Sequence, residues 1–400
     1  KALIDAAHGH GLMVLLDVVY NHFGPDGNYL HSYAAPFFYE DKPTPWGAAI
    51  DFRKLPVQRY FLDNALMWLH EYRFDGLRLD AVHAICPNAF LDTLRQTIQA
   101  SLPTGRQVHL VLENEANQAS QLQRGYTAQW DDDFHNALHV LLTGEEEGYY
   151  AAFADKPTQH LARVLSEGFA YQGEPDPRGH VRGEPSGALP PYKFVVFAQN
   201  HDQIGNRARG ERLTTLVAPQ RLRAALALTA LTPMIPLFFM GEPWGAKQPF
   251  LFFTDFGPPL DEAVREGRRR EFAHFAAFAD PAQRATIPDP NSAATFAASR
   301  SPITDAAHAE GAQWVAWFTA LLDVRRQWLV PGLAQARAVR ASVLAYGAVT
   351  ATWQFPGGLW HIAFNVGTEA VPLPPLRGRV AHAENVAADA QTLPTDSFIA

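Results

Sequence analysis

The stretch Gly76-Leu77-Arg78-Leu79-Asp80 is a short apolar run that ends in an ion pair, and it sets the pattern for the first 250 residues. A segment with helical spacing precedes it, in which Leu62, Leu66 and Leu69 recur at i, i+4 and i+7. Further along, Pro219 can open another helix. Strands that alternate with helices predict a parallel sheet with crossover helices.

Six apolar runs are predicted to be strands: residues 12–19, 76–82, 109–112, 126–130, 194–198 and 235–240. Most of them end in charged or amide residues: Asn21-His22, Asp80, Glu113, Asn200-His201-Asp202 and Glu242. Functional groups at the C-terminal ends of parallel strands are typical of a TIM-type (β/α)8 barrel. Such a barrel needs eight strands, and residues 1–11 already have the pattern of a helix. We therefore expect an α/β barrel that is N-terminally truncated, with its first two strands missing.

The sequence predicts two domains. Residues 1–332 would form the partial catalytic barrel, with a long Gly- and Pro-rich loop at about 168–191 and a helix at 313–329. Residues 333–400 would form a small C-terminal antiparallel β-domain. Within it we predict strands at 342–355 and 359–366, joined by a turn at Pro356-Gly357-Gly358.

Composition excludes several classes of protein. The chain has 400 residues, 47% hydrophobic and 18% charged, which is enough apolar material for a large core and unlike a disordered or coiled-coil chain. A formal net charge of −8 argues against nucleic acid or an anionic membrane as the main partner. The longest apolar stretch, 225–240, is interrupted by Pro233 and Pro236 and is short for a membrane span. With Cys86 as the single cysteine, no intrachain disulfide is possible.

Arg78 and Asp80 form the first candidate pair for chemistry. Strand side chains alternate, so the two point to the same face. An arginine at this spacing can hold the aspartate ionised, and an ionised aspartate at a strand end is a plausible nucleophile. A purely structural ion pair is an equally good interpretation of this motif alone.

Glu113 ends the next strand. Because adjacent strands lie roughly 4.8 Å apart, the carboxylates of Asp80 and Glu113 are expected about 5–5.5 Å apart. That separation is typical of retaining glycosidases, in which one carboxylate attacks and the other is the acid/base. Glu115 shares the parity of Glu113 and competes for the second role. We favour Glu113, because it directly follows the apolar run.

Two further segments supply polar groups. Asn200-His201-Asp202 offers a third carboxylate that could stabilise a cationic transition state, although a turn with a helix cap is the plainer interpretation. Asp17 and Asn21 share one strand face, and His22 could donate to a sugar hydroxyl or be structural. The acidic run Asp131-Asp132-Asp133 is typical of a solvated loop. With no clustered acidic partners for Asn21 either, we predict no metal site.

Four segments resemble, in the same order, the four motifs of the α-amylase superfamily. They are 17–22, 76–83, the strand ending at Glu113, and 200–202. The resemblance implies that Asp80 is the nucleophile, Glu113 the acid/base and Asp202 the transition-state stabiliser. It also implies that Arg78, His22 and His201, with Asp17 and Asn21, bind the sugar at the cleaved bond.

Three longer stretches, 20–30, 129–140 and 197–207, are similar to the maltooligosyltrehalose trehalohydrolase family. The resemblance implies hydrolysis of the α-1,4 bond next to the trehalose unit of maltooligosyltrehalose, with retention and without a cofactor. It further implies a cytoplasmic enzyme whose pathway partner is maltooligosyltrehalose synthase. Two alternatives stay open: a glycogen-branching or debranching relative, against which segment 130–140 argues, and a non-catalytic glucan-binding relative, against which the three retained carboxylates argue.

Overall fold

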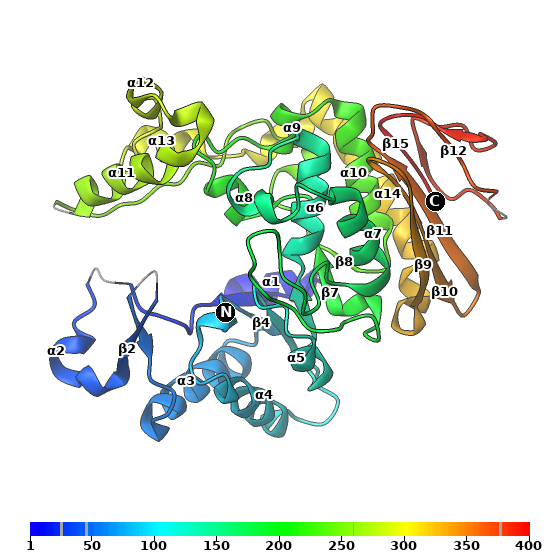
Figure 1. Cartoon of the computed structure of the whole chain (residues 1–400). Helices are drawn as coiled ribbons and strands as arrows, with labels where there is room; N and C mark the ends of the chain where they lie inside the picture. Colours follow the sequence, from blue (N-terminus) through cyan, green and yellow to red (C-terminus); the bar gives the residue numbers. More distant parts are fainter. Residues whose placement is uncertain (25–26, 45–46, 259, 376–377) are drawn as a thin grey trace. The chain divides into compact units, whose positions relative to one another are not determined.

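The computed structural model describes residues 1–24, 27–44, 47–258, 260–375 and 378–400 (Figure 1). The chain divides into two compact units. The first comprises Lys1–Asp131, Tyr171–Glu174 and Val181–Leu189. The second comprises Asp132–Ala170, Pro175–His180 and Pro190–Ala400.

Four parallel strands form the sheet of the first unit. They are β1 (Leu15–Val18), β4 (Gly76–Leu79), β5 (His109–Leu112) and β6 (Ala128–Trp130), adjacent in that order. The helix α1 (Ala2–Gly9) precedes the first of them. The helical segments between them are α3 (Leu55–Leu66), its π-helical continuation η2 (Met67–Glu71), η3 (Val82–Ala84), α4 (Ala89–Ser101) and α5 (Ala119–Gln123). The alternation of strands and helices predicted from the apolar periodicity is confirmed.

The start of β4 shows why this strand begins with glycine. Gly76 pairs with His109 in register, and a Cβ atom on Gly76 would lie 2.3 Å from the carbonyl oxygen of His109. Leu77 and Leu79 are fully buried on the same strand. The close approach of β4 to β5 therefore depends on a residue without a side chain.

A segment that the sequence analysis did not predict lies between β1 and α3. It contains α2 (Leu30–Ala34), the 3₁₀ turn η1 (Ala35–Phe37) and an antiparallel hairpin of β2 (Phe38–Thr44) and β3 (Gly47–Ile50). Aromatic rings hold it to α3: Phe37 lies 5.6 Å from Tyr60 and 6.0 Å from Phe61, measured between ring centroids. The strand count from sequence passed over this segment.

The second unit holds the remaining parallel strands, β7 (Phe194–Val196) and β8 (Ile235–Pro236), which pair with each other. Its helices before β9 are α6 (Asp132–Thr143), η4 (Gly148–Ala152), α7 (Pro157–Glu167), η5 (Pro191–Lys193), α8 (His201–Gly205), α9 (Leu213–Leu216), α10 (Pro219–Leu231), η6 (Glu242–Trp244), α11 (Leu260–Glu271), η7 (Phe272–His274), η8 (Ala276–Phe278), α12 (Pro281–Arg284), α13 (Ala293–Ala298), η9 (Ile303–Ala307), α14 (Ala309–Trp328) and η10 (Val330–Gln335). Pro219 opens α10 as predicted, and α14 confirms the predicted helix at 313–329.

The C-terminal antiparallel β-structure is confirmed, with one correction. A five-stranded sheet has the order β13-β15-β11-β10-β9, and β12 pairs with β14. Figure 1 labels β9, β10, β11 and β15 of the larger sheet. The bounds are β9 Arg337–Ala345, β10 Ala348–Phe355, β11 Gly358–Asn365, β12 Val371–Pro372, β13 Ala383–Glu384, β14 Thr392–Leu393 and β15 Ser397–Ile399. The run 342–355, predicted as one strand, is two, because Gly347 (φ +74°) makes a turn between β9 and β10.

All six predicted parallel strands are present, each shorter than its apolar run or equal to it. No helix or 3₁₀ segment is found at 168–190, as expected for the long loop. The α/β class and the C-terminal antiparallel sheet agree with the predicted fold. None of the helices that the structure describes is long and apolar enough to cross a membrane.

Candidate active site

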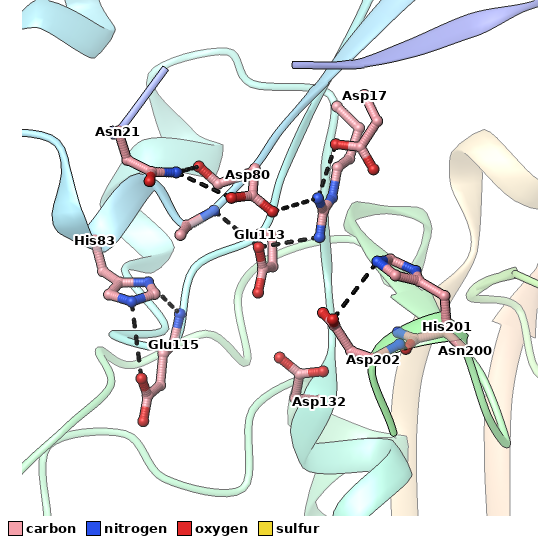
Figure 2. Close-up of polar contacts among 12 residues, drawn as sticks. Asp17, Asn21, Asp80, His83, Glu113, Glu115, Asp132, Asn200, His201 and Asp202 are labelled. Carbon is pink, nitrogen blue, oxygen red and sulfur yellow. Dashed lines mark hydrogen bonds and ion pairs between the residues drawn. The ribbon is translucent and has the colours of Figure 1, made fainter. Parts of the chain in front are cut away.

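The guanidinium of Arg78 is the centre of the candidate site in the first unit. Its Nη1 donates to Asp17 Oδ1 at 2.7 Å and to Asp80 Oδ1 at 2.8 Å, and its Nη2 lies 3.0 Å from Glu113 Oε2 (Figure 2). Burial by itself would lower the pKa of Arg78, but the three carboxylates outweigh burial and raise that pKa. One buried cation thus faces carboxylates from three adjacent strands.

The register of the sheet explains this convergence. Arg78 of β4 lies opposite Asp17 of β1 and Val111 of β5. Asp80 and Glu113 follow the last residues of their strands, so both carboxylates project from the C-terminal edge of the sheet. The predicted pairing of Arg78 with Asp80 is confirmed.

Asp80 is also held by the end of β1. Asn21 Nδ2 donates to Asp80 Oδ2 at 3.0 Å and to the Asp80 carbonyl at 2.9 Å. The Asn21 side-chain oxygen in turn accepts from His22 Nδ1. Burial lowers the pKa of His22, which the nearby Asp80 only partly offsets. A neutral His22 therefore orients the amide that orients Asp80.

Glu113 is fixed by a backbone donor. The amide of Ala81 donates to Glu113 Oε2 at 2.8 Å, and Val82 N donates to the Glu113 carbonyl at 3.0 Å. Ala81 adopts a left-handed conformation (φ +40°). This turn directs its amide back towards the next strand.

Glu115 lies in a different environment from Glu113. Its side chain is 77% exposed, against 20% for Glu113. Glu115 Oε2 lies 3.8 Å from His83 Nε2, and its backbone amide donates to His83 Nδ1 at 3.4 Å. Burial lowers the pKa of His83. Of the two competing glutamates, Glu113 is the one bound to the Arg78 cluster, which supports the preference drawn from the sequence.

An aromatic ring completes the surroundings of Arg78. The guanidinium carbon lies 4.1 Å from the ring centroid of Trp130, at the end of β6. A cation stacked on an indole face is stabilised in addition to its ion pairs. Sequence reasoning missed this contact and the Ala81 amide, and no local pattern signalled either of them.

Asn200, His201 and Asp202 lie in the second unit, at the end of β7. The Asn200 side chain caps α8, accepting from Asp202 N at 2.9 Å and Gln203 N at 3.4 Å. His201 Nε2 lies 3.6 Å from Asp202 Oδ1, and both side chains are nearly half exposed. The segment is a helix cap, as the plainer interpretation held, and it also presents a carboxylate beside an imidazole (Figure 2).

The acidic run at 131–133 corrects an expectation. It was predicted to be a solvated loop, but Asp131 and Asp133 are fully buried. Asp132 and Asp133 occupy the first turn of α6, where carboxylates favour the helix dipole, and Asp133 accepts from Ala170 N at 2.8 Å. Within the residues that the structure describes, no three or more His, Cys, Asp or Glu side chains are grouped to hold a metal ion.

The chemistry available in the first unit is therefore that of a carboxylate pair sharing one arginine. An ionised carboxylate at Asp80 could attack an electrophilic carbon, and a carboxyl at Glu113 could give or take a proton beside it. These are the parts of a double-displacement mechanism at an acetal centre.

Comparisons with known proteins find relatives in sequence and in structure. The chain is 43% identical to a putative α-amylase of known crystal structure from Salmonella typhimurium, with a TM-score of 0.92, and covers 69% of that protein. It is 41% identical over 332 residues to malto-oligosyltrehalose trehalohydrolase from Deinococcus radiodurans, covering 82% of this chain and 54% of that protein. A 1,4-alpha-glucan branching enzyme from Rhodopseudomonas palustris matches only 88 residues, at 42% identity, 20% of this chain and 12% of that enzyme. Residues 336–399 match the family described as a domain of unknown function, DUF3459.

The fold, the four ordered motifs and these similarities define the class: the chain belongs to the α-amylase superfamily. Within that superfamily, its sequence is similar to those of several malto-oligosyltrehalose trehalohydrolases, 39–41% identical over 82–85% of this chain. The chain spans about half the length of the curated relatives that it matches.

Proposed function

We propose that the protein is a retaining glycoside hydrolase in which Asp80 is the nucleophile and Glu113 the general acid/base. The observation that carries this proposal is the single Arg78 guanidinium between the two carboxylates, 2.8 Å from Asp80 and 3.0 Å from Glu113. Asp80 attacks the anomeric carbon while Glu113 protonates the leaving oxygen. Glu113 then deprotonates the water that hydrolyses the glycosyl ester.

Asp202 is proposed as the third carboxylate, which stabilises the positive charge of the oxocarbenium-like transition state. The match of 200–202 to the superfamily motif supports this role. Asp17, Asn21, His22, Arg78 and His201 are proposed to bind the sugar at the cleaved bond or to orient the groups that do. No metal and no cofactor takes part in these steps.

The proposed substrate is maltooligosyltrehalose, cleaved at the α-1,4 bond next to the trehalose unit. The support comes from relatives named malto-oligosyltrehalose trehalohydrolase, which are 35–42% identical over 68–82% of this chain. A cytoplasmic location and a synthase that makes the substrate complete the proposal. Glucan transfer is the second candidate function, because the chain is also similar to a branching enzyme. It ranks second because that similarity is confined to 88 residues.

The deciding experiment is to incubate the intact protein with maltotriosyltrehalose and to analyse the sugars formed. Trehalose and maltotriose in equal amounts, without transfer products, are the expected result. New α-1,6 linkages would instead establish a branching enzyme. Binding of the sugar without any cleavage would establish a non-catalytic relative.

A further inference from the structure

We propose that His135, in the family-specific segment 130–140, is a positioning residue for Asp202. This inference rests on the proposed function, because it assigns a role toward the carboxylate that would stabilise the transition state. All of the residues involved belong to the second unit. The argument follows from where the backbone around Asp202 is anchored.

The first anchor lies just before Asp202. His135 Nδ1 is 2.8 Å from the carbonyl oxygen of Ala198, and a carbonyl oxygen only accepts. The proton must therefore be on Nδ1. Burial lowers the pKa of the fully buried His135 to about 3, so the ring is neutral and Nε2 is an acceptor. Tyr150, whose hydroxyl lies 3.2 Å from Nε2, is then the donor.

The second anchor lies just after Asp202. Arg207, two residues beyond α8, donates through Nη1 and Nη2 to the two carboxylate oxygens of Glu145, at 2.6 Å and 2.8 Å. Glu145 also accepts from His139 Nε2 at 2.8 Å. The ring of His139 stacks on Tyr150, with centroids 4.1 Å apart. His135 and His139 are one helical turn apart on α6, so a single helix face contacts both ends of the segment.

A third anchor approaches through a different element. Gln199 Nε2 donates to Glu242 Oε1 at 2.9 Å, and Gln199 Oε1 accepts from Leu213 N at 3.0 Å. The short segment 198–207 is thus held at Ala198, Gln199 and Arg207, while the Asp202 side chain itself is nearly half exposed. Reactive groups that are exposed but held on a buried, hydrogen-bonded backbone are pre-organised for a fixed geometry.

The hydrogen bond to Ala198 distinguishes His135 from an ordinary core residue. If it were lost, the carbonyl before the Asn200 cap would be buried without its donor, and the start of α8 would shift to find another. Displacement of a catalytic group by about 1 Å costs on the order of 100-fold in rate. Sugar binding that does not depend on Asp202 would be unaffected.

The test is a double-mutant cycle in the intact protein, with maltotriosyltrehalose as substrate. His135→Leu should lower kcat about 10- to 100-fold with little change in KM. His135→Asn keeps an N–H donor near the position of Nδ1 and should recover most of the loss. In the Asp202→Asn background, His135→Leu should have little further effect on kcat.

Hydrogen exchange at residues 198–207 gives a readout that does not require activity. His135→Leu should speed exchange there. The matched control is His160→Leu, which removes another mostly buried histidine, on α7, whose imidazole lies 3.6 Å from Asp155. It should leave exchange at 198–207 and kcat unchanged.

Two results would overturn the inference: an equal loss of kcat from His135→Leu in both backgrounds, or unchanged exchange at 198–207. Failure of the proposed function has a different signature, since the unmodified protein would then release no trehalose. Exchange at 198–207 would still decide the role of His135 in that case.

Discussion

At the level of one residue, Arg78 makes more contacts than a single ion pair with Asp80. Its guanidinium contacts Asp17, Asp80 and Glu113 and stacks on Trp130. Lysine could not replace it, because a single ammonium cannot present separate N–H groups in one plane and an extended face to an aromatic ring. The buried cation also limits the repulsion between carboxylates that must lie close together.

Asp80→Asn should abolish turnover while preserving the fold. The amide cannot form the glycosyl ester, so we expect kcat to fall by several orders of magnitude, on the order of 10⁴-fold or more. The side chains of aspartate and asparagine both have an oxygen that can accept the hydrogen bond from Asn21. Initial rates on maltotriosyltrehalose measure the loss of turnover, and thermal unfolding measures whether the fold is preserved. Near-normal turnover would remove Asp80 as the nucleophile.

Glu113 and Glu115 can be separated by substrates that differ in their need for an acid. Glu113→Gln should slow cleavage of maltotriosyltrehalose far more than attack on an activated α-glycosyl fluoride, which needs no protonation. Azide, which needs no base, should then restore turnover by attacking the glycosyl ester, releasing the Asp80 carboxylate and giving a glycosyl azide of retained α configuration. Glu115→Gln is the matched control, because its exposed side chain lies outside the Arg78 cluster.

For this pair, a selective defect and azide rescue in the Glu115 variant would move the acid/base role by two residues. A β-configured azide would be a larger correction, because it would exclude the retaining mechanism.

At the level of elements, the sequence predicted contacts within one strand and which strand ends are neighbours, and it missed contacts that depend on the exact register between strands. Arg78 and Asp80 are two residues apart on one strand, so their pairing followed from alternation. The contact between Arg78 and Asp17 requires the alignment of β4 with β1. Trp130 comes from β6, two strands further along the sheet, and the positive φ of Ala81 has no sequence signal, because alanine does not favour it.

The same distinction explains the two errors of assignment. Gly347 turns the chain between β9 and β10, but the apolar residues on either side read as one strand. The acids at 131–133 are expected to be solvated, because composition alone does not distinguish an acidic loop from acids buried at the start of a helix. In both places the tertiary environment overrides the local pattern.

Gly76→Ala tests how closely β4 and β5 must approach. The new Cβ would lie 2.3 Å from the His109 carbonyl oxygen, and this contact is with backbone that cannot rotate away. We expect the free energy of unfolding to fall by about 1–3 kcal/mol or more. Gly9→Ala is the control, because no heavy atom lies within 4 Å of its Cβ position. Urea denaturation of both variants would measure the difference, and equal midpoints would contradict it.

On the scale of the whole molecule, two buried groups that anchor the Asp202 segment should contribute to how stability depends on pH. Burial raises the pKa of Glu242 to about 8 from its ordinary 4.5. The nearby charge of Arg212 and the donors Gln199 and Phe239 N reduce this effect without cancelling it. Burial, followed by the charges of His139 and Arg207, lowers the pKa of His135 from 6.5 to about 3, and the hydrogen bond to Ala198 only partly opposes this.

The two shifts act in opposite directions. The pKa of Glu242 is raised in the folded state, so its contribution to the free energy of unfolding decreases as pH rises from 4.5 to about 8. The pKa of His135 is lowered in the folded state, so its contribution to the free energy of unfolding decreases as pH falls from 6.5 towards about 3. Between these two groups, only Glu242 acts above pH 6.5 and only His135 acts below pH 4.5.

Urea unfolding of the protein, Glu242→Gln and His135→Asn at a series of pH values tests this assignment. Each group can contribute a slope of up to about 1.4 kcal/mol per pH unit inside its window. Glu242→Gln should reduce the slope of the decline between pH 6.5 and 8 and leave the slope below pH 4.5 unchanged. His135→Asn should reduce the slope below pH 4.5, to which other carboxyl groups also contribute, and leave the slope above pH 6.5 unchanged. The comparison concerns slopes, because glutamine lacks one of the two oxygen acceptors of Glu242 and its absolute stability will differ. If the decline above pH 6.5 persisted in Glu242→Gln, the buried carboxyl would not be the group that titrates there.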